Sequence, residues 1–205
     1  MPDGSPSPPP PPGVPEERLA ADGWTLQEHR AEALVELPAA EVLGHTLVYE
    51  DGRLRAAVRE ATGGRIDRMW RYFFATRLTF RPPLPPGVGP AMVFPAVARA
   101  AESAFADELE GRGFRDVSRG RRERVRVDTG ERARLRRYTA TLDDGDAGIQ
   151  LDVAGWLGVW THDGFRVAGG AYPATPLGAL LHSDEVGPDP NECRDELLDL
   201  IRAVS

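Results

Sequence analysis

The densest group of charged side chains lies between residues 112 and 137. This segment holds 11 arginines and four acidic residues, so its net charge is +7 in a chain whose formal net charge is −7. A guanidinium group forms paired hydrogen bonds with a carboxylate or a phosphate. The segment therefore predicts an anion-binding surface. The alternative is an exposed face whose arginines are neutralised by carboxylates of the same chain.

The register of a hairpin inside this segment decides which arginines lie together. The turn Asp128-Thr129-Gly130 has the length and the closing glycine of a three-residue hairpin loop. In that register one face is mostly apolar and the other carries arginines in directly opposed pairs. The pairs are Arg122 with Arg136, Arg124 with Arg134, and Arg126 with Arg132. Opposed like charges destabilise a sheet, so we expect this face to bind an anion, either an acidic protein or an anionic ligand.

Nucleic acid is the less favoured partner, because the chain as a whole is acidic. All 25 basic residues are arginine, and the chain has no lysine. A high-salt cytosol and a GC-rich genome would each produce this composition, and the composition does not choose between them. In molar salt, long-range attraction to nucleic acid is weakened further.

Residue patterns for catalysis, metal binding or a cofactor are weak or missing in the sequence. The four histidines lack zinc-site spacing, and a Walker-type phosphate loop needs a lysine. Cys193 lies on the apolar stripe of a predicted helix, where we expect a buried, inert thiol. We therefore expect no cofactor, no metal and no catalytic residue, and we favour a non-enzymatic binding or accessory module. The alternative is an enzyme of unknown reaction with a pocket near the hairpin of Trp156 and Trp160.

The elements that position these residues can be predicted from apolar periodicity. Period-two alternation predicts strands, and apolar stripes at i, i+3 and i+4 predict helices. Strands are expected at 24–37, 42–49, 66–80, 121–127, 132–142, 150–160 and 165–172, and helices at 51–62, 91–112 and 192–204. Because short turns join most consecutive strands, we predict an α+β fold. It is a mainly antiparallel sheet of about six or seven strands covered by helices, an α/β/α sandwich.

Two of these strands differ in the faces they are expected to bury. The strand 66–80 has large apolar or aromatic residues at even positions and two arginines among apolar residues at odd positions. The even positions are Trp70, Tyr72, Phe74, Leu78 and Phe80, and the odd positions are Met69, Phe73 and Ala75, together with Arg71 and Arg77. The even side is therefore predicted to face the core. The strand 150–160 is apolar on both faces, which predicts a central strand covered from both sides.

The first 22 residues are expected to form a disordered tail, followed by a single domain at 23–205. Residues 2–15 hold eight prolines and few apolar side chains, so this stretch cannot bury enough surface to fold. The chain has one cysteine and no apolar run of about 18 residues, which predicts a soluble cytoplasmic protein without membrane contact. The oligomeric state cannot be predicted from these features.

Several passages resemble known proteins. The strand hairpin 149–161 with 165–172, followed by a C-terminal helix, resembles the group of small α/β/α proteins that includes PsbP, the Ran-binding protein Mog1 and the lipoprotein LpqN. The sequences GWLGVW at 155–160, FRVAGGAYP at 165–173 and WRYFFATR at 70–77 are similar to an uncharacterised haloarchaeal protein family. The resemblance implies the sandwich fold, but neither group has a catalytic signature or activity that would assign functional residues here.

Overall fold

The computed structural model describes residues 10–37, 40–144, 148–181 and 186–205. Within these ranges it contains five helices and seven strands, and the predicted α+β class is confirmed. The helices are α1 (Glu16–Ala21), α2 (Gly52–Ala61), α3 (Pro90–Gly111), α4 (Leu177–Leu181) and α5 (Pro190–Arg202). The strands are β1 (Trp24–Leu37), β2 (Ala40–Asp51), β3 (Tyr72–Arg81), β4 (Phe114–Arg126), β5 (Arg132–Asp144), β6 (Ile149–Thr161) and β7 (Phe165–Pro173).

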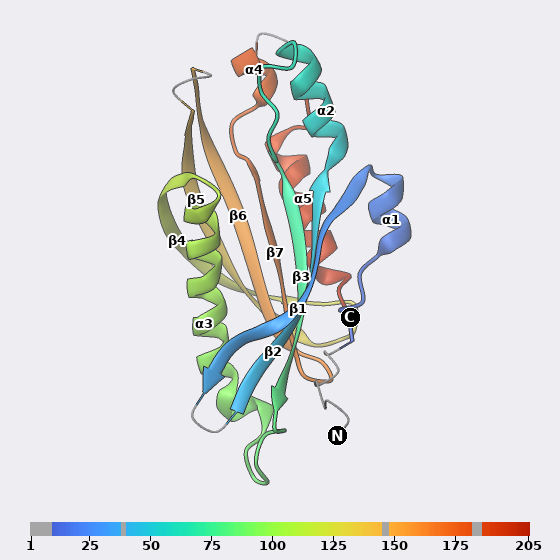
Figure 1. The fold of residues 1–205 in the computed structure, drawn as a ribbon, viewed down its shortest axis with the longest axis vertical. Helices are drawn as coiled ribbons and strands as arrows, with labels where there is room; N and C mark the ends of the chain where they lie inside the picture. Colours follow the sequence, from blue (N-terminus) through green and yellow to red (C-terminus); the bar gives the residue numbers. More distant parts are fainter. Residues whose placement is uncertain (1–9, 38–39, 145–147, 182–185) are drawn as a thin grey trace, which may run out of the picture.

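The seven strands form one antiparallel sheet in the order β1-β2-β3-β7-β6-β5-β4 (Figure 1). The sheet consists of two groups of strands that are each close in sequence, β1 to β3 and β4 to β7. The pairing of β3 with β7 joins the two groups and runs from Tyr72 opposite Ala171 to Leu78 opposite Phe165. The edges are β1 and β4, and each has two register shifts against its neighbour.

The close approach of β7 to β3 depends on a glycine. A Cβ atom at Gly170 would lie 2.1 Å from the carbonyl oxygen of Tyr72. Any other residue would push the two strands apart, so the absence of a side chain at Gly170 lets the two groups of strands pair.

Helices cover both faces of the sheet, which gives the predicted three layers (Figure 1). We call the two faces the α3 face and the α5 face. On the α3 face, Phe105 packs in a cluster with Tyr138 and Leu157. On the α5 face, Leu197 packs in a second cluster with Trp160. Strand β6 supplies buried residues to both clusters, which confirms the prediction of a strand covered from both sides.

Strand β3 is shorter than predicted, and both of its faces are buried. It begins at Tyr72, and the preceding residues 66–70 have no strand structure. The odd-numbered Phe73 and Ala75 are both 0% exposed in the cluster under α5. The core therefore lies on both sides of β3 and not on its even side alone, because β3 is an interior strand and α5 covers its odd side.

The segment before β1 is partly folded. Residues 1–9 of the expected tail lie outside the described residues. Helix α1 falls inside the segment assigned to the tail, and its Leu19 is 1% exposed in the cluster under α5. The backbones of Gly13 and Ser205 also exchange two hydrogen bonds, of 2.8 and 3.0 Å. Ordered structure thus begins before residue 23. Among the helices described, none has the length and apolar character needed to span a bilayer.

Candidate functional site

The arginine hairpin has the predicted register. Arg122 lies opposite Arg136, Arg124 opposite Arg134, and Arg126 opposite Arg132. The turn closes with a backbone hydrogen bond from Val127 to Glu131, and Gly130 has φ +101°. A positive φ favours glycine at this position of a three-residue loop. We call the six arginines of these pairs the arginine face.

The arginine face lies on the α3 face of the sheet, where one carboxylate of α3 reaches it. Glu102 is 5% exposed, and its two oxygens pair with Arg122 at 3.1 Å and Arg134 at 3.5 Å. The hydroxyl of Tyr138 donates to the Glu102 carbonyl oxygen at 2.8 Å, and the ring of Phe105 meets the Tyr138 ring edge-on. These contacts fix α3 against β5, so Arg122 and Arg134 have a clear structural role.

The other four arginines of this face have no carboxylate partner in the part of the chain that the structure describes. They are Arg124, Arg126, Arg132 and Arg136. Arg126 donates only to the Gly130 carbonyl oxygen, at 3.4 Å. Three of the four are exposed, and Arg136 is half-buried. An exposed group of unpaired guanidinium groups is an arrangement that binds carboxylates or phosphates.

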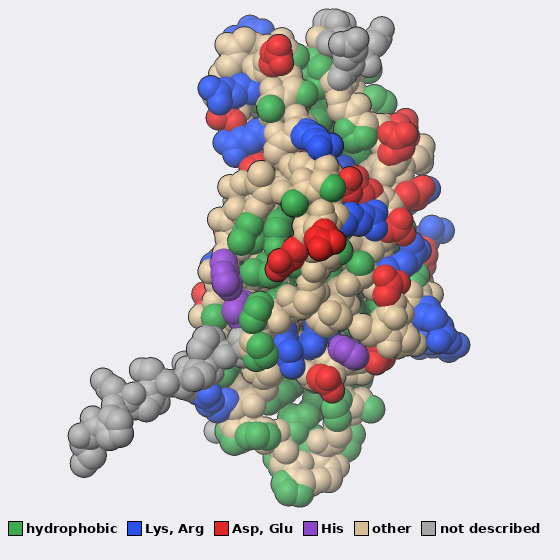
Figure 2. All heavy atoms as spheres, turned by 90° about the vertical axis from the view of Figure 1, so that its right-hand side faces the viewer, with side chains coloured by type: hydrophobic (Ala, Val, Ile, Leu, Met, Phe, Trp, Pro, Cys, Tyr) green, Lys and Arg blue, Asp and Glu red, His purple; other side chains and the backbone are tan. Residues whose placement is uncertain are grey.

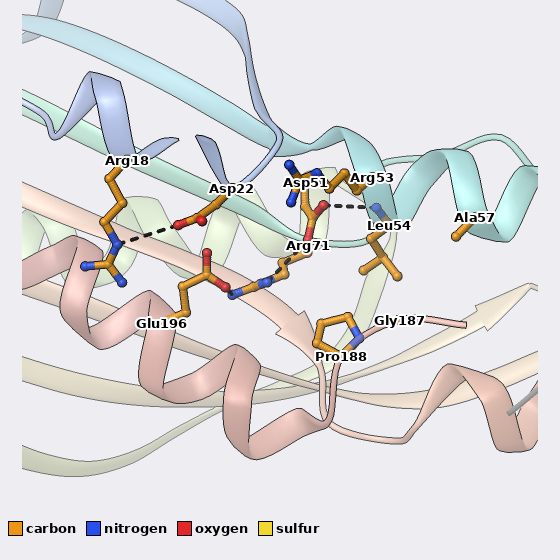
Figure 3. Close-up of a pocket in the computed structure, with 10 residues that line it drawn as sticks. All are labelled: Arg18, Asp22, Asp51, Arg53, Leu54, Ala57, Arg71, Gly187, Pro188 and Glu196. Carbon is orange, nitrogen blue, oxygen red and sulfur yellow. Dashed lines mark hydrogen bonds and ion pairs between the residues drawn. The ribbon is translucent and has the colours of Figure 1, made fainter. Parts of the chain in front are cut away.

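A cleft of about 510 Å³ lies between α1, α2 and α5 and contains a second set of charges (Figure 3). At its base Arg71 is 2% exposed. Its guanidinium bonds Glu196 at 2.7 Å, the Cys193 carbonyl at 3.2 Å and Asp51 at 3.3 Å. The ring of Trp24 lies 4.8 Å from the guanidinium carbon, and its indole N–H donates to Glu196 at 2.9 Å.

The remaining polar groups of this cleft are also engaged. Asp51 accepts from the backbone of Leu54 and so caps α2. Arg53 donates to the Ala21 carbonyl at 2.7 Å, and Arg18 lies 3.7 Å from Asp22. Of the polar side-chain groups in the cleft, only the Nε–H of Arg71 is buried without a partner among the described residues. Because the charges of the cleft are otherwise paired with one another, we interpret these contacts as structural, holding the N-terminal segment, α2, β3 and α5 together.

An apolar groove of about 530 Å³ lies between α3 and strands β1 to β3. Along this side α3 presents small residues, and the sheet opposite presents Phe74, Leu78 and Phe80. The hydroxyls of Thr46 and Thr76 pair with each other at 2.9 Å. The Tyr72 hydroxyl is buried without a hydrogen bond of normal geometry, and the Arg112 guanidinium lies 4.4 Å from the centre of its ring. Burial raises the pKa of Tyr72, so the hydroxyl keeps its proton.

The other residues considered from the sequence are placed away from these openings. Trp156 and Trp160 pack under α5 and line neither the cleft nor the groove. Cys193 is 2% exposed, as predicted. His29 and His45 meet across β1 and β2 with 2.5 Å between their Nε2 atoms, a contact in which one ring donates and the other accepts. Among the described residues there is no group of three or more His, Cys, Asp or Glu that could hold a metal ion.

Sequence reasoning missed Glu102 and Glu196, two of the carboxylates that pair with arginines here. A signal for Glu102 exists, because it interrupts the apolar stripe of α3 between Ala98 and Phe105. An acidic residue on a buried stripe requires a cationic partner. No comparable signal marks Glu196, which lies on a half-buried position of α5.

Comparison with curated proteins and with solved structures gives no significant match to either. One family model, described as Domain of unknown function (DUF6517), matches residues 11–205. This match includes α1 and all seven strands, so it covers the ordered domain described above. The chain therefore belongs to the DUF6517 family.

Proposed function

We propose that this domain is a cytoplasmic, non-enzymatic binding module whose arginine face binds an acidic segment of a partner protein. One observation carries the proposal. Four of the six arginines lack a carboxylate partner in the ranges described, although their strands oppose like charges directly. An acidic partner would relieve that repulsion and would form charge-assisted hydrogen bonds with the exposed guanidinium groups.

The arrangement of the face supports a protein partner over nucleic acid. Glu102 already neutralises the end nearest α3, and the arginines without a carboxylate partner among the described residues cover only the part of the β4–β5 hairpin near its turn. The chain outside residues 112–137 has a net charge of −14, the difference between −7 and +7. That charge would repel an extended polyanion but tolerate a short acidic segment.

As part of the same proposal, we assign the chain a host and a group of distant relatives. The passages at 70–77, 155–160 and 165–173 support a haloarchaeal origin, and the lysine-free composition is compatible with it. The hairpin of β6 and β7 with α5 supports a distant relation to the PsbP, Mog1 and LpqN group. In molar salt the Debye length is about 3 Å, so only direct ion pairs survive, which again favours a protein contact.

The test measures binding of a fluorescent polyglutamate peptide by anisotropy. The variant Arg124→Gln/Arg126→Gln removes two unpaired cations, and Arg59→Gln/Arg99→Gln removes two exposed cations from α2 and α3 as a matched control. We expect at least a tenfold weaker peptide affinity in the first variant, since each charged hydrogen bond contributes about 1.5–3 kcal/mol. The control should bind like the wild type.

Two results would contradict the proposal. The first is equal peptide affinity in both variants together with a lower melting temperature in Arg124→Gln/Arg126→Gln. This result would show that the arginine face is an internal structural layer. Tighter binding of a duplex DNA of equal charge at the same salt concentration would assign the face to nucleic acid instead.

The groove under α3 favours a second candidate function, the binding of a small apolar molecule with one hydrogen-bonding group. Its volume of about 530 Å³ falls within the range of small-molecule sites, and the buried Tyr72 hydroxyl would supply the polar contact. The neutral fluorescent probe N-phenyl-1-naphthylamine tests this. Ala101→Phe, which fills the groove, should abolish the rise in probe fluorescence, whereas Arg124→Gln/Arg126→Gln should not. Unchanged probe binding in Ala101→Phe would exclude the groove.

A further inference from the structure

On the α5 face, four strands bring nitrogen-bearing side chains into one row. His45 of β2 lies opposite Arg77 of β3, Arg77 opposite Arg166 of β7, and Arg166 opposite Trp160 of β6. Residues directly opposite on neighbouring strands have Cβ atoms about 5 Å apart. This row lies on the opposite side of the sheet from the arginine face. In Figure 2, which faces the right-hand side of Figure 1, basic side chains are visible between the histidine side chains.

The centre of the row is buried and has no acceptor for its donors. Arg166 is 2% exposed and Trp160 is 0% exposed. The Nε–H of Arg77, the Nε–H of Arg166 and the indole N–H of Trp160 are all buried without a hydrogen-bond partner in the described part of the chain. Buried donors of this kind are rare in folded proteins and call for an acceptor.

The contacts that Arg77 and Arg166 do make are weak and uncharged. Arg166 donates to the Phe165 carbonyl and Arg77 to the Asp163 carbonyl, each at 3.4 Å. Within residues 10–37, 40–144, 148–181 and 186–205, no carboxylate forms an ion pair with either guanidinium. The two cations therefore face each other in register without a counter-ion.

The environment of Arg166 disfavours its charged form. Burial lowers its pKa to about 10, and the positive charge of Arg77 acts in the same direction, while Asp163 and Glu131 oppose it only in part. Glu131 is held elsewhere, by hydrogen bonds with Thr129 and His162. A buried charge without a partner destabilises a fold strongly. Arg77 is half-buried, so this end of the row is partly accessible to solvent.

We propose that Arg77 and Arg166 form a binding site for a small oxyanion, a carboxylate, phosphate or sulfate group, which supplies the missing acceptor. Two guanidinium groups offer several N–H donors to the oxygens of such a group. The site is independent of the arginine face and of the groove, because its residues lie on the other side of the sheet.

The test is thermal unfolding of the full chain at constant ionic strength, with chloride replaced stepwise by phosphate, sulfate or acetate. We expect the melting temperature of the wild type to rise by about 5 °C or more once the oxyanion is a hundredfold above its dissociation constant. Comparing the three anions identifies the group: a larger rise with phosphate and sulfate assigns a tetrahedral oxyanion, and a larger rise with acetate assigns a carboxylate.

Variants separate this site from general salt effects and from the arginine face. Phosphate and sulfate stabilise most proteins by exclusion from the surface, so the relevant quantity is the difference from Arg77→Gln, in which the specific rise should disappear. Arg124→Gln should retain the part of the rise that Arg77→Gln loses, whatever the arginine face itself contributes. If Arg77→Gln does not fold, Arg166→Met replaces it and should likewise lose the rise. An equal rise in the wild type and in the variant of Arg77 or Arg166 would overturn the proposal.

Discussion

Arg71 and Arg166 are both 2% exposed on the α5 face, yet their surroundings differ in the one property that matters most for a buried charge. Arg71 has two carboxylates, a carbonyl oxygen and the face of Trp24 around it. Among the described residues Arg166 has one long hydrogen bond to a carbonyl, and the residue opposite it on β3 is another arginine. Burial alone therefore does not distinguish a structural arginine from a ligand-binding one, whereas the presence of counter-ions does.

The largest expected effect is at Arg71. Arg71→Met leaves Asp51 and Glu196 without their shared cation in a partly buried cleft. Removing one partner of a buried ionic group costs about 3–5 kcal/mol, so we expect the free energy of unfolding in urea to fall by that amount at an unchanged m-value. A loss below about 1 kcal/mol would mean that water, not Arg71, satisfies the two carboxylates.

The same substitution at Arg166 should raise the free energy of unfolding instead of lowering it. Arg166→Met removes an unpaired buried charge and keeps an unbranched side chain of similar length. In chloride buffer without oxyanions we expect a gain of about 1–3 kcal/mol in the free energy of unfolding, the cost of an unsatisfied buried polar group. Arg77→Met is the control, and its gain should be smaller because Arg77 is only half-buried. A loss of stability in Arg166→Met would remove the contrast with Arg71.

A smaller loss of stability is expected at Trp24, whose ring lies against the Arg71 guanidinium. Trp24→Phe keeps an aromatic face under the guanidinium but removes the indole N–H that donates to Glu196. We expect a loss of about 1 kcal/mol, the net contribution of one hydrogen bond. Trp24→Leu, which removes the aromatic face as well, should lose more in the same urea titration. Equal losses would assign no energy to the cation–π contact.

The smallest effect is a local one at Cys193, whose carbonyl accepts from Arg71. Burial raises the pKa of the Cys193 thiol to about 11, so the folded protein holds little thiolate at pH 8 and should react slowly with a thiol-reactive dye. Because the unfolded thiol ionises near pH 9.0, stability should decline between pH 9 and 11. Labelling should be faster in Arg71→Met, because losing the Arg71 contacts to the Cys193 carbonyl and Glu196 lets α5 open locally, and it should be unchanged in Arg166→Met. Faster labelling in both variants would indicate general loosening of α5.

The fold could be predicted largely from local patterns. The strands β5, β6 and β7 begin and end within two residues of the predicted limits, because their apolar alternation and their Gly-containing turns lie in the sequence itself. The pairing of Arg124 with Arg134 followed from the length of one turn. Helices α1 and α4 were missed because they have six and five residues, too few for an apolar stripe to repeat.

The environments of the charges could not be predicted in the same way. Arg71 and Arg77 were both visible as cations on an otherwise apolar side of a strand, and the sequence treats them alike. Glu196 lies 125 residues after Arg71, and only the packing of α5 on the sheet brings it close. Long-range packing of this kind decides whether a buried arginine forms an ion pair with a carboxylate, and a local sequence pattern does not encode it.

The pairing of β3 with β7 has a consequence for how the chain folds. Strands β1 to β3 can pair by closing short or moderate loops, and so can β4 to β7, whereas β3 and β7 meet across about ninety residues. Closing that loop costs chain entropy before contacts compensate for it, so we expect the two half-sheets to form early and to dock late. Arg77 and Arg166 lie opposite each other where β3 pairs with β7. Their repulsion therefore opposes the late docking of the two half-sheets. An oxyanion bound there would therefore act mainly on the rate at which the two halves separate.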